Sequence, residues 1–304
     1  MKRGEKRMIL IFMAPLAAVY LIFFLYPTVR TGFMSFFELS SLSSSIENWN
    51  FVGLKNYTEL FHNSLFLKSY GNIIKILLIG GAVVFAISLY FAVVMQGRFK
   101  GKKMLRAIIY LPNIITPVAL VAMWTQYIFN SQFGLLHSIF SALGLKGLAN
   151  IPWNSSQMAF WSMLIAYSFG SVGYYMVIYM AAMEQIPEDY FECARIEGAN
   201  RFQIFRGITL PLLKPTTNTA LTFWAAGAVN FFLWSRVFSA NPLEPGTLVP
   251  ASYMFTMAFG SNQMSTSAGL KVGSASAIGV LLTLTMLAVY ALIHLCSGKE
   301  KNEY

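Results

Sequence analysis

The sequence predicts an all-α, polytopic integral membrane protein with six transmembrane helices. Hydrophobic residues fill 56% of its 304 positions and charged residues only 11%, a balance that does not suit a surface exposed to water. Six stretches without Asp, Glu, Lys or Arg are also long enough to cross about 30 Å of hydrocarbon at about 1.5 Å per residue. Disordered chains, coiled coils and disulfide-stapled secreted modules are thereby excluded.

Each predicted span is supported separately by its lack of charge. A charged side chain at the centre of a spanning helix costs about 2.5 to 3.5 kcal/mol on an insertion scale. The chain then divides into a tail of residues 1–7, a membrane domain of residues 8–295 and a tail of residues 296–304. The spans cover residues 8–29, 76–95, 107–129, 157–183, 215–235 and 272–295.

The first span follows four basic residues, as the apolar segment of a signal peptide does. Its apolar run is too long for a signal peptide, and no small-residue cleavage site follows it. We therefore expect a retained signal anchor.

Four prolines lie inside or at the ends of the first and third spans. In lipid, neighbouring helices can satisfy the carbonyl groups that a proline frees. We therefore expect kinks rather than breaks at Pro15, Pro27, Pro112 and Pro117.

The basic residues are divided unevenly between the two sides of the predicted bundle. Fifteen Lys and Arg lie in the two tails and in the connections 96–106 and 184–214, against five in the opposite connections. The positive-inside rule therefore places both termini in the cytoplasm. The formal net charge of +10 is then an orientation signal, and we expect no nucleic-acid partner. Cys193 and Cys296 fall in or beside cytoplasmic segments, so no disulfide framework is implied.

The cytoplasmic connection 184–214 has a pattern of its own. Pro187 stands where a first helical residue would and Gly198 where a helix would stop, which predicts an amphipathic helix of about three turns. Asn200 can cap a second short helix. The apolar faces would carry Tyr190, Phe191 and Ala194 in the first helix and Phe202, Phe205 and Ile208 in the second.

Two explanations are open for these apolar faces. They could pack on the cytoplasmic ends of the chain's own spans or lie at the lipid interface, or they could dock a cytoplasmic partner. The connection carries five acidic residues, which suits helices on an anionic leaflet poorly. Composition therefore favours docking.

The residues of this connection resemble the EAA motif of ABC-importer permeases. That motif runs Glu-Ala-Ala, three residues, Gly, nine residues, Ile, any residue and Leu-Pro, and only Cys193, in place of Ala, departs from it here. The match also falls before the penultimate span, where that family carries it. The resemblance implies that the ATPase-coupling residues are Glu192, Cys193, Ala194, Gly198, Ile208, Leu210 and Pro211.

Further segments are similar to the carbohydrate-uptake permeases of the MalF and UgpA type. The likeness covers roughly residues 15–294, and includes Phe51-Val52-Gly53-Leu54 ahead of the second span and Ala277-Ile278 in the last. It implies a type I ABC importer permease in the plasma (inner) membrane of a prokaryote. The implied partners are a second, MalG-like permease subunit, a cytoplasmic ATPase dimer, an extracytoplasmic solute-binding protein, membrane lipid and a sugar substrate.

Two departures from that group lie on the predicted outer face. Residues 239–245 read Ser-Ala-Asn-Pro-Leu-Glu-Pro where many members have a Thr-x-Gly-Gly-Pro turn, and His137 stands where Asn is common. Both concern the side that would face a binding protein, and neither touches the coupling motif.

The chain lacks the motifs of a catalytic or metal site. It contains no His-Glu-x-x-His and no Cys-x-x-Cys, and its three histidines stand alone. Residues 97–102 resemble a phosphate loop only superficially, because the two glycines are one residue too close and no Ser or Thr follows the lysine. We expect no enzyme activity, cofactor or metal in this chain, and ATP hydrolysis in separate subunits.

The absence of charge from the spans also bears on the cargo. A path for anions would need Arg or Lys at depth and one for cations Asp or Glu, whereas a neutral polyhydroxylated solute needs amides, hydroxyls and aromatic faces. Single residues of this kind can equally join helices or form aromatic belts. Asn230, expected to be buried near Phe231 and Trp234, is the favoured sugar contact. The other candidates on the substrate path are Phe231, Trp234, Tyr174 and Ser171.

The sequence thus predicts a permease subunit that couples cytoplasmic ATP hydrolysis to uptake of a sugar or oligosaccharide by alternating access. One alternative is an importer of the same architecture for glycerol phosphate or another small solute. Another is a membrane structural or signalling subunit without transport. A membrane enzyme is least expected, since no paired acid and base lies at membrane depth.

Overall fold

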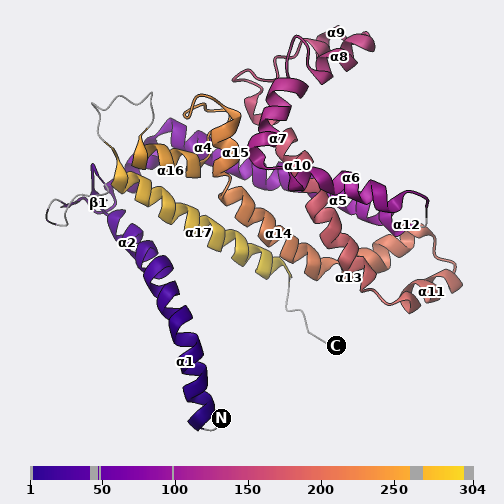
Figure 1. Cartoon of the computed structure of the whole chain (residues 1–304), viewed down its shortest axis with the longest axis horizontal. Helices are drawn as coiled ribbons and strands as arrows, with labels where there is room; N and C mark the ends of the chain where they lie inside the picture. Colours follow the sequence, from indigo (N-terminus) through magenta and orange to yellow (C-terminus); the bar gives the residue numbers. More distant parts are fainter. Residues whose placement is uncertain (1–2, 42–46, 48, 98, 261–269, 298–304) are drawn as a thin grey trace. The chain divides into compact units, whose positions relative to one another are not determined.

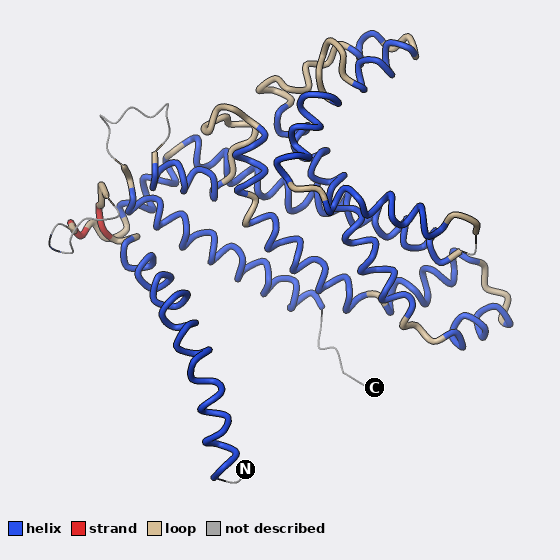
Figure 2. Tube along the Cα trace, viewed as in Figure 1, coloured by secondary structure: helices blue, strands red, loops and turns tan. Residues whose placement is uncertain are grey.

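The computed structural model describes residues 3–41, 47, 49–97, 99–260 and 270–297 (Figures 1 and 2). These residues are mostly helical, and the sheet that they contain pairs two strands of two residues each. The all-α prediction is therefore confirmed. The ends of the two predicted tails, residues 1–2 and 298–304, lie outside the described residues.

Four helices in the described part of the chain are long and apolar enough to cross a membrane. A fifth candidate is a pair of helices bent by 99° at a short break. They run over Ile11–Met34, Ser64–Gln96, Ala159–Glu184 and Val272–Leu295, with the bent pair Lys102–Ile114 and Pro117–Ile128. Helix length and composition therefore support four of the six predicted spans, and a fifth if the bent pair forms one span.

The chain forms two compact units, of which the first comprises residues 1–67 and 253–284. It begins with one uninterrupted run of helix in which Pro15 and Pro27 cause no break. Strands β1 and β2 pair antiparallel, with Phe37 opposite Phe51. The elements from the N-terminus are α1 (Arg3–Tyr20), the π-helical turn η1 (Leu21–Leu25), α2 (Tyr26–Met34), β1 (Phe37–Glu38), β2 (Asn50–Phe51) and α3 (Lys55–His62). Helices α4 (Ser64–Lys75), α16 (Pro250–Phe259) and α17 (Val272–Ser297) lie partly in this unit.

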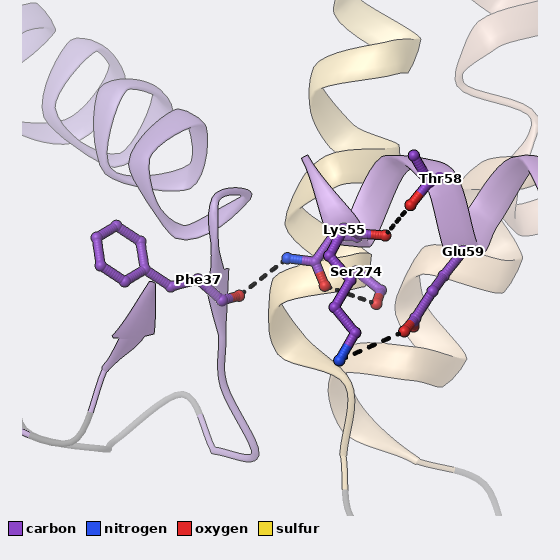
Figure 3. Close-up of polar contacts among 6 residues, drawn as sticks. Phe37, Lys55, Thr58, Glu59 and Ser274 are labelled. Carbon is purple, nitrogen blue, oxygen red and sulfur yellow. Dashed lines mark hydrogen bonds and ion pairs between the residues drawn. The ribbon is translucent and has the colours of Figure 1, made fainter. Parts of the chain in front are cut away.

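A buried amide, that of Asn56 on α3, joins the segments of the first unit. Its Nδ2 donates to the backbone oxygens of Ser35 at 2.8 Å and Phe37 at 3.0 Å. Its Oδ1 accepts from the hydroxyl of Ser274, at the start of α17, at 3.2 Å, and Figure 3 shows this bond beside the one to Phe37. Because a buried amide without partners is costly, these bonds fix the position of α3 relative to α17.

The second unit comprises residues 68–252 and 285–304. Its first half consists of η3 (Ile76–Gly80), α5 (Gly81–Gln96), α6 (Lys102–Ile114), α7 (Pro117–Ala122), η4 (Met123–Ile128), α8 (Leu135–Ala142) and α9 (Lys146–Ala149). Its second half consists of α10 (Ala159–Glu184), α11 (Glu188–Ile196), α12 (Arg201–Ile204), η5 (Phe205–Thr209), α13 (Leu210–Leu212), α14 (Lys214–Val229) and α15 (Phe232–Phe238).

Helix α10 is the centre of the second unit. It packs against α5, α6 and α14, and most of its side chains are buried. At its C-terminal end, the residues Met176, Tyr179, Met180 and Met183 form one apolar cluster with the end of α5 and with Leu213. This cluster supports the connection that follows α10.

Trp224 on α14 connects three of the predicted spans. Its ring is 1% exposed, and its Nε1 donates to the backbone oxygen of Leu77 in the π-helical turn η3 at 3.0 Å. The ring also packs edge-on against Tyr175 of α10, with 5.9 Å between ring centroids. The hydrogen bond therefore joins α14 to η3, and the ring contact joins α14 to α10.

The third predicted span is broken rather than kinked, so that prediction is wrong at Pro117. Helix α6 contains Pro112 and ends at Ile114, and α7 begins at Pro117. Ile115 and Thr116 between them are both extended, with ψ of 135° and 143°. A proline disfavours the helical conformation at the residue before it, and two successive extended residues turn the chain sharply.

The fifth predicted span is also divided into two helices. Helix α14 ends at Val229, and α15 begins at Phe232. Asn230 has φ −94° and ψ 35°, and Phe231 has φ −76° and ψ 20°. Neither helix alone is long enough to cross a membrane, so this span remains a prediction.

Candidate functional site

The connection 184–214 forms the two short helical segments that the sequence predicts. Helix α11 begins directly after Pro187, which takes the N-cap position and not the first helical one. Glu188 and Asp189 lie in its first turn and Arg195 in its last, where each charge opposes the helix dipole. The exposed ion pair between Arg195 and Glu188, at 4.0 Å, adds little stability.

Gly198 ends α11 through a backbone motif. Its φ is +79°, in the left-handed region, and its N–H donates to Arg195 O at 3.1 Å. The N–H of Ala199 donates to Ala194 O at 2.9 Å. This pair of bonds is the Schellman arrangement, which needs a residue that adopts positive φ without strain. The sequence prediction that the helix stops at Gly198 is therefore confirmed.

Asn200 caps the second segment through a reciprocal pair of hydrogen bonds. The N–H of Gln203 donates to Asn200 Oδ1 at 2.9 Å, and the N–H of Asn200 donates to Gln203 Oε1 at 2.8 Å. Such a box satisfies two of the otherwise unpaired N–H groups at a helix start. From this cap, α12, η5 and α13 follow one another directly to Leu212.

A groove of about 970 Å³ lies between this connection and the ends of the chain's own spans. Phe191 of α11 faces the groove, together with Ile204 and Phe205 of the second segment. Lys102, Arg195 and Arg201 bring positive charge to its wall, and Glu184 and Glu188 bring negative charge. One apolar face of the connection therefore lies along the chain's own helices.

Other apolar side chains of the connection point away from the protein. Ile196 is 84% exposed and Phe202 67%, and Tyr190 is also exposed. Between them Glu192 is exposed and makes no hydrogen bond or ion pair with the described residues. Cys193 beside it is an exposed free thiol. The outward surface, Tyr190, Glu192, Cys193, Ile196 and Phe202, is named the coupling face below.

The remaining motif residues lie outside this surface. Ala194 and Ile208 are half-buried, and Leu210 and Pro211 are exposed at the approach to α14. Of the motif residues, Glu192 and Cys193 therefore belong to the coupling face. The sequence did not separate Phe191 from Tyr190, because the ends of α5 and α10 decide which of these neighbours is covered.

The predicted substrate-path residues gather around Tyr167 of α10. Its ring lies edge-on to Phe231, with 4.6 Å between centroids, and to Trp234, at 5.2 Å. Ser171, one turn further along α10, donates its hydroxyl to Tyr167 O at 2.8 Å. Tyr174 on the next turn is 37% exposed. Tyr167 stands four residues before Ser171 and seven before Tyr174, so helical spacing identifies it as part of this face.

The prediction that Asn230 is buried is wrong. Its side chain is exposed, whereas Phe231 beside it is 1% exposed and fills the space against Tyr167. Both residues lie at the break between α14 and α15, where one is exposed and the other buried. Asn230 therefore offers its amide to the surroundings, and Phe231 has a packing role in the second unit.

Comparisons with known proteins match nearly the whole chain. The family model for the binding-protein-dependent transport system inner membrane component matches residues 68–298. The probable ABC transporter permease protein YurN of Bacillus subtilis is 28% identical over 92% of this chain and 92% of its own length. The arabinooligosaccharides transport system permease protein AraP of the same organism is 27% identical over 96% and 89%. The diacetylchitobiose uptake system permease protein NgcF of Streptomyces coelicolor is 26% identical over 93% and 81%.

The fold matches a solved membrane transporter. A chain of a bacterial ABC transporter involved in the import of the acidic polysaccharide alginate superposes with a TM-score of 0.79 at 18% sequence identity. The match covers 98% of this chain and 97% of that chain. A chain of a bacterial alginate ABC transporter in complex with an alginate pentasaccharide-bound periplasmic protein also superposes with a TM-score of 0.79, at 18% sequence identity.

Proposed function

The chain belongs to the family of binding-protein-dependent transport system inner membrane components, and from that premise we propose that it is the membrane-spanning subunit of an ATP-driven sugar or oligosaccharide importer. Relatives with 26% and 27% identity over most of the chain are permease proteins of a diacetylchitobiose uptake system and of an arabinooligosaccharides transport system. The six spans predicted from the sequence contain no Asp, Glu, Lys or Arg, which suits a neutral hydroxylated cargo. ATP is hydrolysed in separate subunits.

The coupling face carries this proposal. It presents three exposed apolar side chains and an unpaired carboxylate on a connection whose two segments are both capped. Exposed apolar groups on a rigid, charged connection are typical of a protein docking surface. We propose that Tyr190, Ile196 and Phe202 enter a groove on the ATPase and that Glu192 accepts a hydrogen bond from a basic or amide group there.

The solute would cross beside the break between α14 and α15. Discontinuous helices at membrane depth occur where unpaired backbone and amide groups line a binding site. Asn230 offers an exposed amide at this break, and Tyr174 offers a partly exposed ring from α10. The proposed path therefore has the hydrogen-bonding groups and aromatic faces that a sugar needs.

This proposal includes six spans, with the broken segment 215–235 as the fifth. Both termini and the connection 184–214 would lie in the cytoplasm, on the side where Lys and Arg are concentrated. The complete importer would contain a second, MalG-like permease subunit, an ATPase dimer and an extracytoplasmic solute-binding protein. For the alginate transporter that shares this fold, a complex with a periplasmic protein has been solved.

A matched pair of substitutions tests the coupling face. Glu192→Gln removes the charge of the unpaired carboxylate, and Glu197→Gln makes the same change at an exposed position where the motif specifies no residue. The assembled importer in nanodiscs is assayed for sugar-stimulated ATP hydrolysis and for the amount of ATPase that copurifies. We expect Glu192→Gln to lower stimulated hydrolysis about 10-fold or more, because a charge-assisted hydrogen bond contributes about 1.5 to 3 kcal/mol.

Two results would count against the proposed function. If no ATPase copurifies with the wild-type chain, a structural or signalling subunit becomes the better explanation. If ATPase copurifies and the two variants behave alike, the role of Glu192 is wrong while the importer assignment stands.

A further inference from the structure

The second unit contains a partly open polar cavity of about 410 Å³ whose lining includes neither the coupling face nor Asn230. Three segments form it, namely the turn η4, the loop before α10 and the loop after α15. Both loops belong to connections that the charge pattern assigns to the outside. The lining residues are Thr125, Asn154, Ser156, Ala159, Phe238, Ser239, Ala240, Asn241 and Glu244.

Hydrogen bonds from Asn72 on α4 hold the loop that supplies Glu244. Asn72 is buried, and its Nδ2 donates to the backbone oxygens of Pro245 and Leu248, each at 2.9 Å. Gly246 passes so close to the loop before α10 that an added Cβ would lie 2.9 Å from Ser156 O. The cavity wall is therefore built by fixed backbone, and its polar groups are positioned before any ligand arrives.

Several lining groups keep unused hydrogen-bonding capacity toward the cavity. The Glu244 carboxylate accepts from Ser156 Oγ through Oε2 at 3.1 Å, and its Oε1 has no partner among the described residues. Asn241 accepts from the Leu243 N–H through Oδ1, which leaves its amide donor available. Asn154 donates to Thr125 O at 2.9 Å, which leaves its amide oxygen available. Acceptors and a donor thus converge on one small space.

The chemistry of this lining selects among ligand classes. No lysine or arginine lines the cavity, so an anion would meet only the negative charge of Glu244. One carboxylate is too few for a calcium site, which needs six to eight oxygen ligands. The lining instead matches a sugar. Its carboxylate oxygen, two amides and hydroxyls can hydrogen-bond with adjacent hydroxyl groups of a sugar ring, and Phe238 can pack against the apolar face of that ring.

We propose that this cavity is a subsite for one ring of a neutral or cationic sugar at the outer mouth of the subunit, with Glu244 as the acceptor that excludes acidic sugars. The inference rests on the proposed function, and it adds a selectivity for charge that the chain itself exerts. The volume of about 410 Å³ falls at the small end of the roughly 300 to 1,000 Å³ of small-molecule sites, which suits one or two rings.

Direct binding to the assembled transporter, in nanodiscs and without its binding protein, tests the subsite. The neutral probes are maltotriose, arabinotriose and diacetylchitobiose, and the acidic probe is trigalacturonate. Saturation-transfer NMR gives the Kd of each. We expect at least one neutral probe to bind 10-fold or more tightly than the acidic probe. Glu244→Gln should weaken that neutral probe about 10-fold, since hydrogen bonds to charged groups are the strong ones.

Three controls separate the possible outcomes. Glu59→Gln makes the same change at an exposed carboxylate of the first unit and should leave every Kd unchanged. If Asn230→Ala abolishes binding while Glu244→Gln does not, the sugar occupies the proposed path, and the subsite is wrong although the importer assignment stands. If Glu244→Gln weakens binding of the sugar-free solute-binding protein instead, the cavity holds a segment of that protein, and the subsite is wrong. Absence of sugar uptake by the complete importer would overturn both proposals.

Discussion

Replacing Gly198 by alanine should loosen α11 without removing any side-chain contact. The glycine has φ +79°, and a Cβ added to it would meet nothing within 4 Å. The effect is therefore purely conformational, since an L-residue in the left-handed region costs roughly 1 to 2 kcal/mol. That cost falls on the Schellman turn, whose two hydrogen bonds hold the last carbonyls of α11. A free energy of this size changes a local opening equilibrium about 5- to 30-fold.

Hydrogen exchange on the nanodisc-embedded importer measures this change. The amides of Cys193 to Gly198 should exchange about 5- to 30-fold faster in the variant, while those of α10 keep the wild-type rate. Gly207→Ala is the matched control, because its Cβ would also meet nothing within 4 Å but its φ is not positive. Alanine favours the helix there, so exchange should stay the same or slow down.

Two outcomes would refute this reasoning. Equal exchange in the Gly198→Ala variant and the wild type would mean that the turn does not limit the opening of α11. Equal acceleration by Gly207→Ala would mean that the connection responds to any added methyl group, and not to the conformation at Gly198. Loss of sugar-stimulated ATP hydrolysis in Gly198→Ala alone, at unchanged ATPase copurification, would add that a rigid α11 transmits the coupling.

Two further substitutions test the supports of each unit. Asn56→Ala removes the donor to two backbone carbonyls, which should cost about 1 to 3 kcal/mol and lower the unfolding temperature in detergent. The same change at the exposed Asn150 should leave that temperature unchanged, and equal temperatures for the two variants would show that the hydrogen bonds of Asn56 are dispensable. Gly173→Ala should destabilise the second unit more than Gly147→Ala, because a Cβ at the first position would overlap the backbone of Ile109 on α6 while the second has open space. Equal yields of folded protein from these two variants would contradict that close approach.

Local signals in the sequence predicted the helices of the connection 184–214 well. The stop at Gly198 and the cap at Asn200 follow from the conformational freedom of glycine and the hydrogen bonding of one amide, so they need no knowledge of the rest of the fold. The break before Pro117 also had a local signal, the preference of Thr116 for extended backbone. It was missed because the charge-free run on both sides of the proline was interpreted as one helix.

Features that depend on packing could not be predicted in the same way. Asn230 is exposed and its neighbour Phe231 is buried. This difference depends on the packing of Phe231 against Tyr167 of α10, which the sequence alone does not show. The distinction between Phe191 in the groove and Tyr190 on the coupling face likewise depends on the ends of α5 and α10. Composition showed that these faces existed, but the tertiary arrangement determined their partners.

Helix α15 links the two proposed solute contacts. Asn230 and Phe231 precede its first residue, and Phe238 at its last residue lines the outer cavity. The seven residues of α15 span only about 10 Å, which is about the length of two sugar rings. A sugar that leaves the cavity would therefore have only this distance to travel to the break between α14 and α15. Tyr167 packs on Phe231 and Trp234, which fixes this short helix against α10. A rearrangement of α10 that frees α15 would therefore change the outer subsite and the amide of Asn230 together, so that one conformational change acts on both proposed solute contacts.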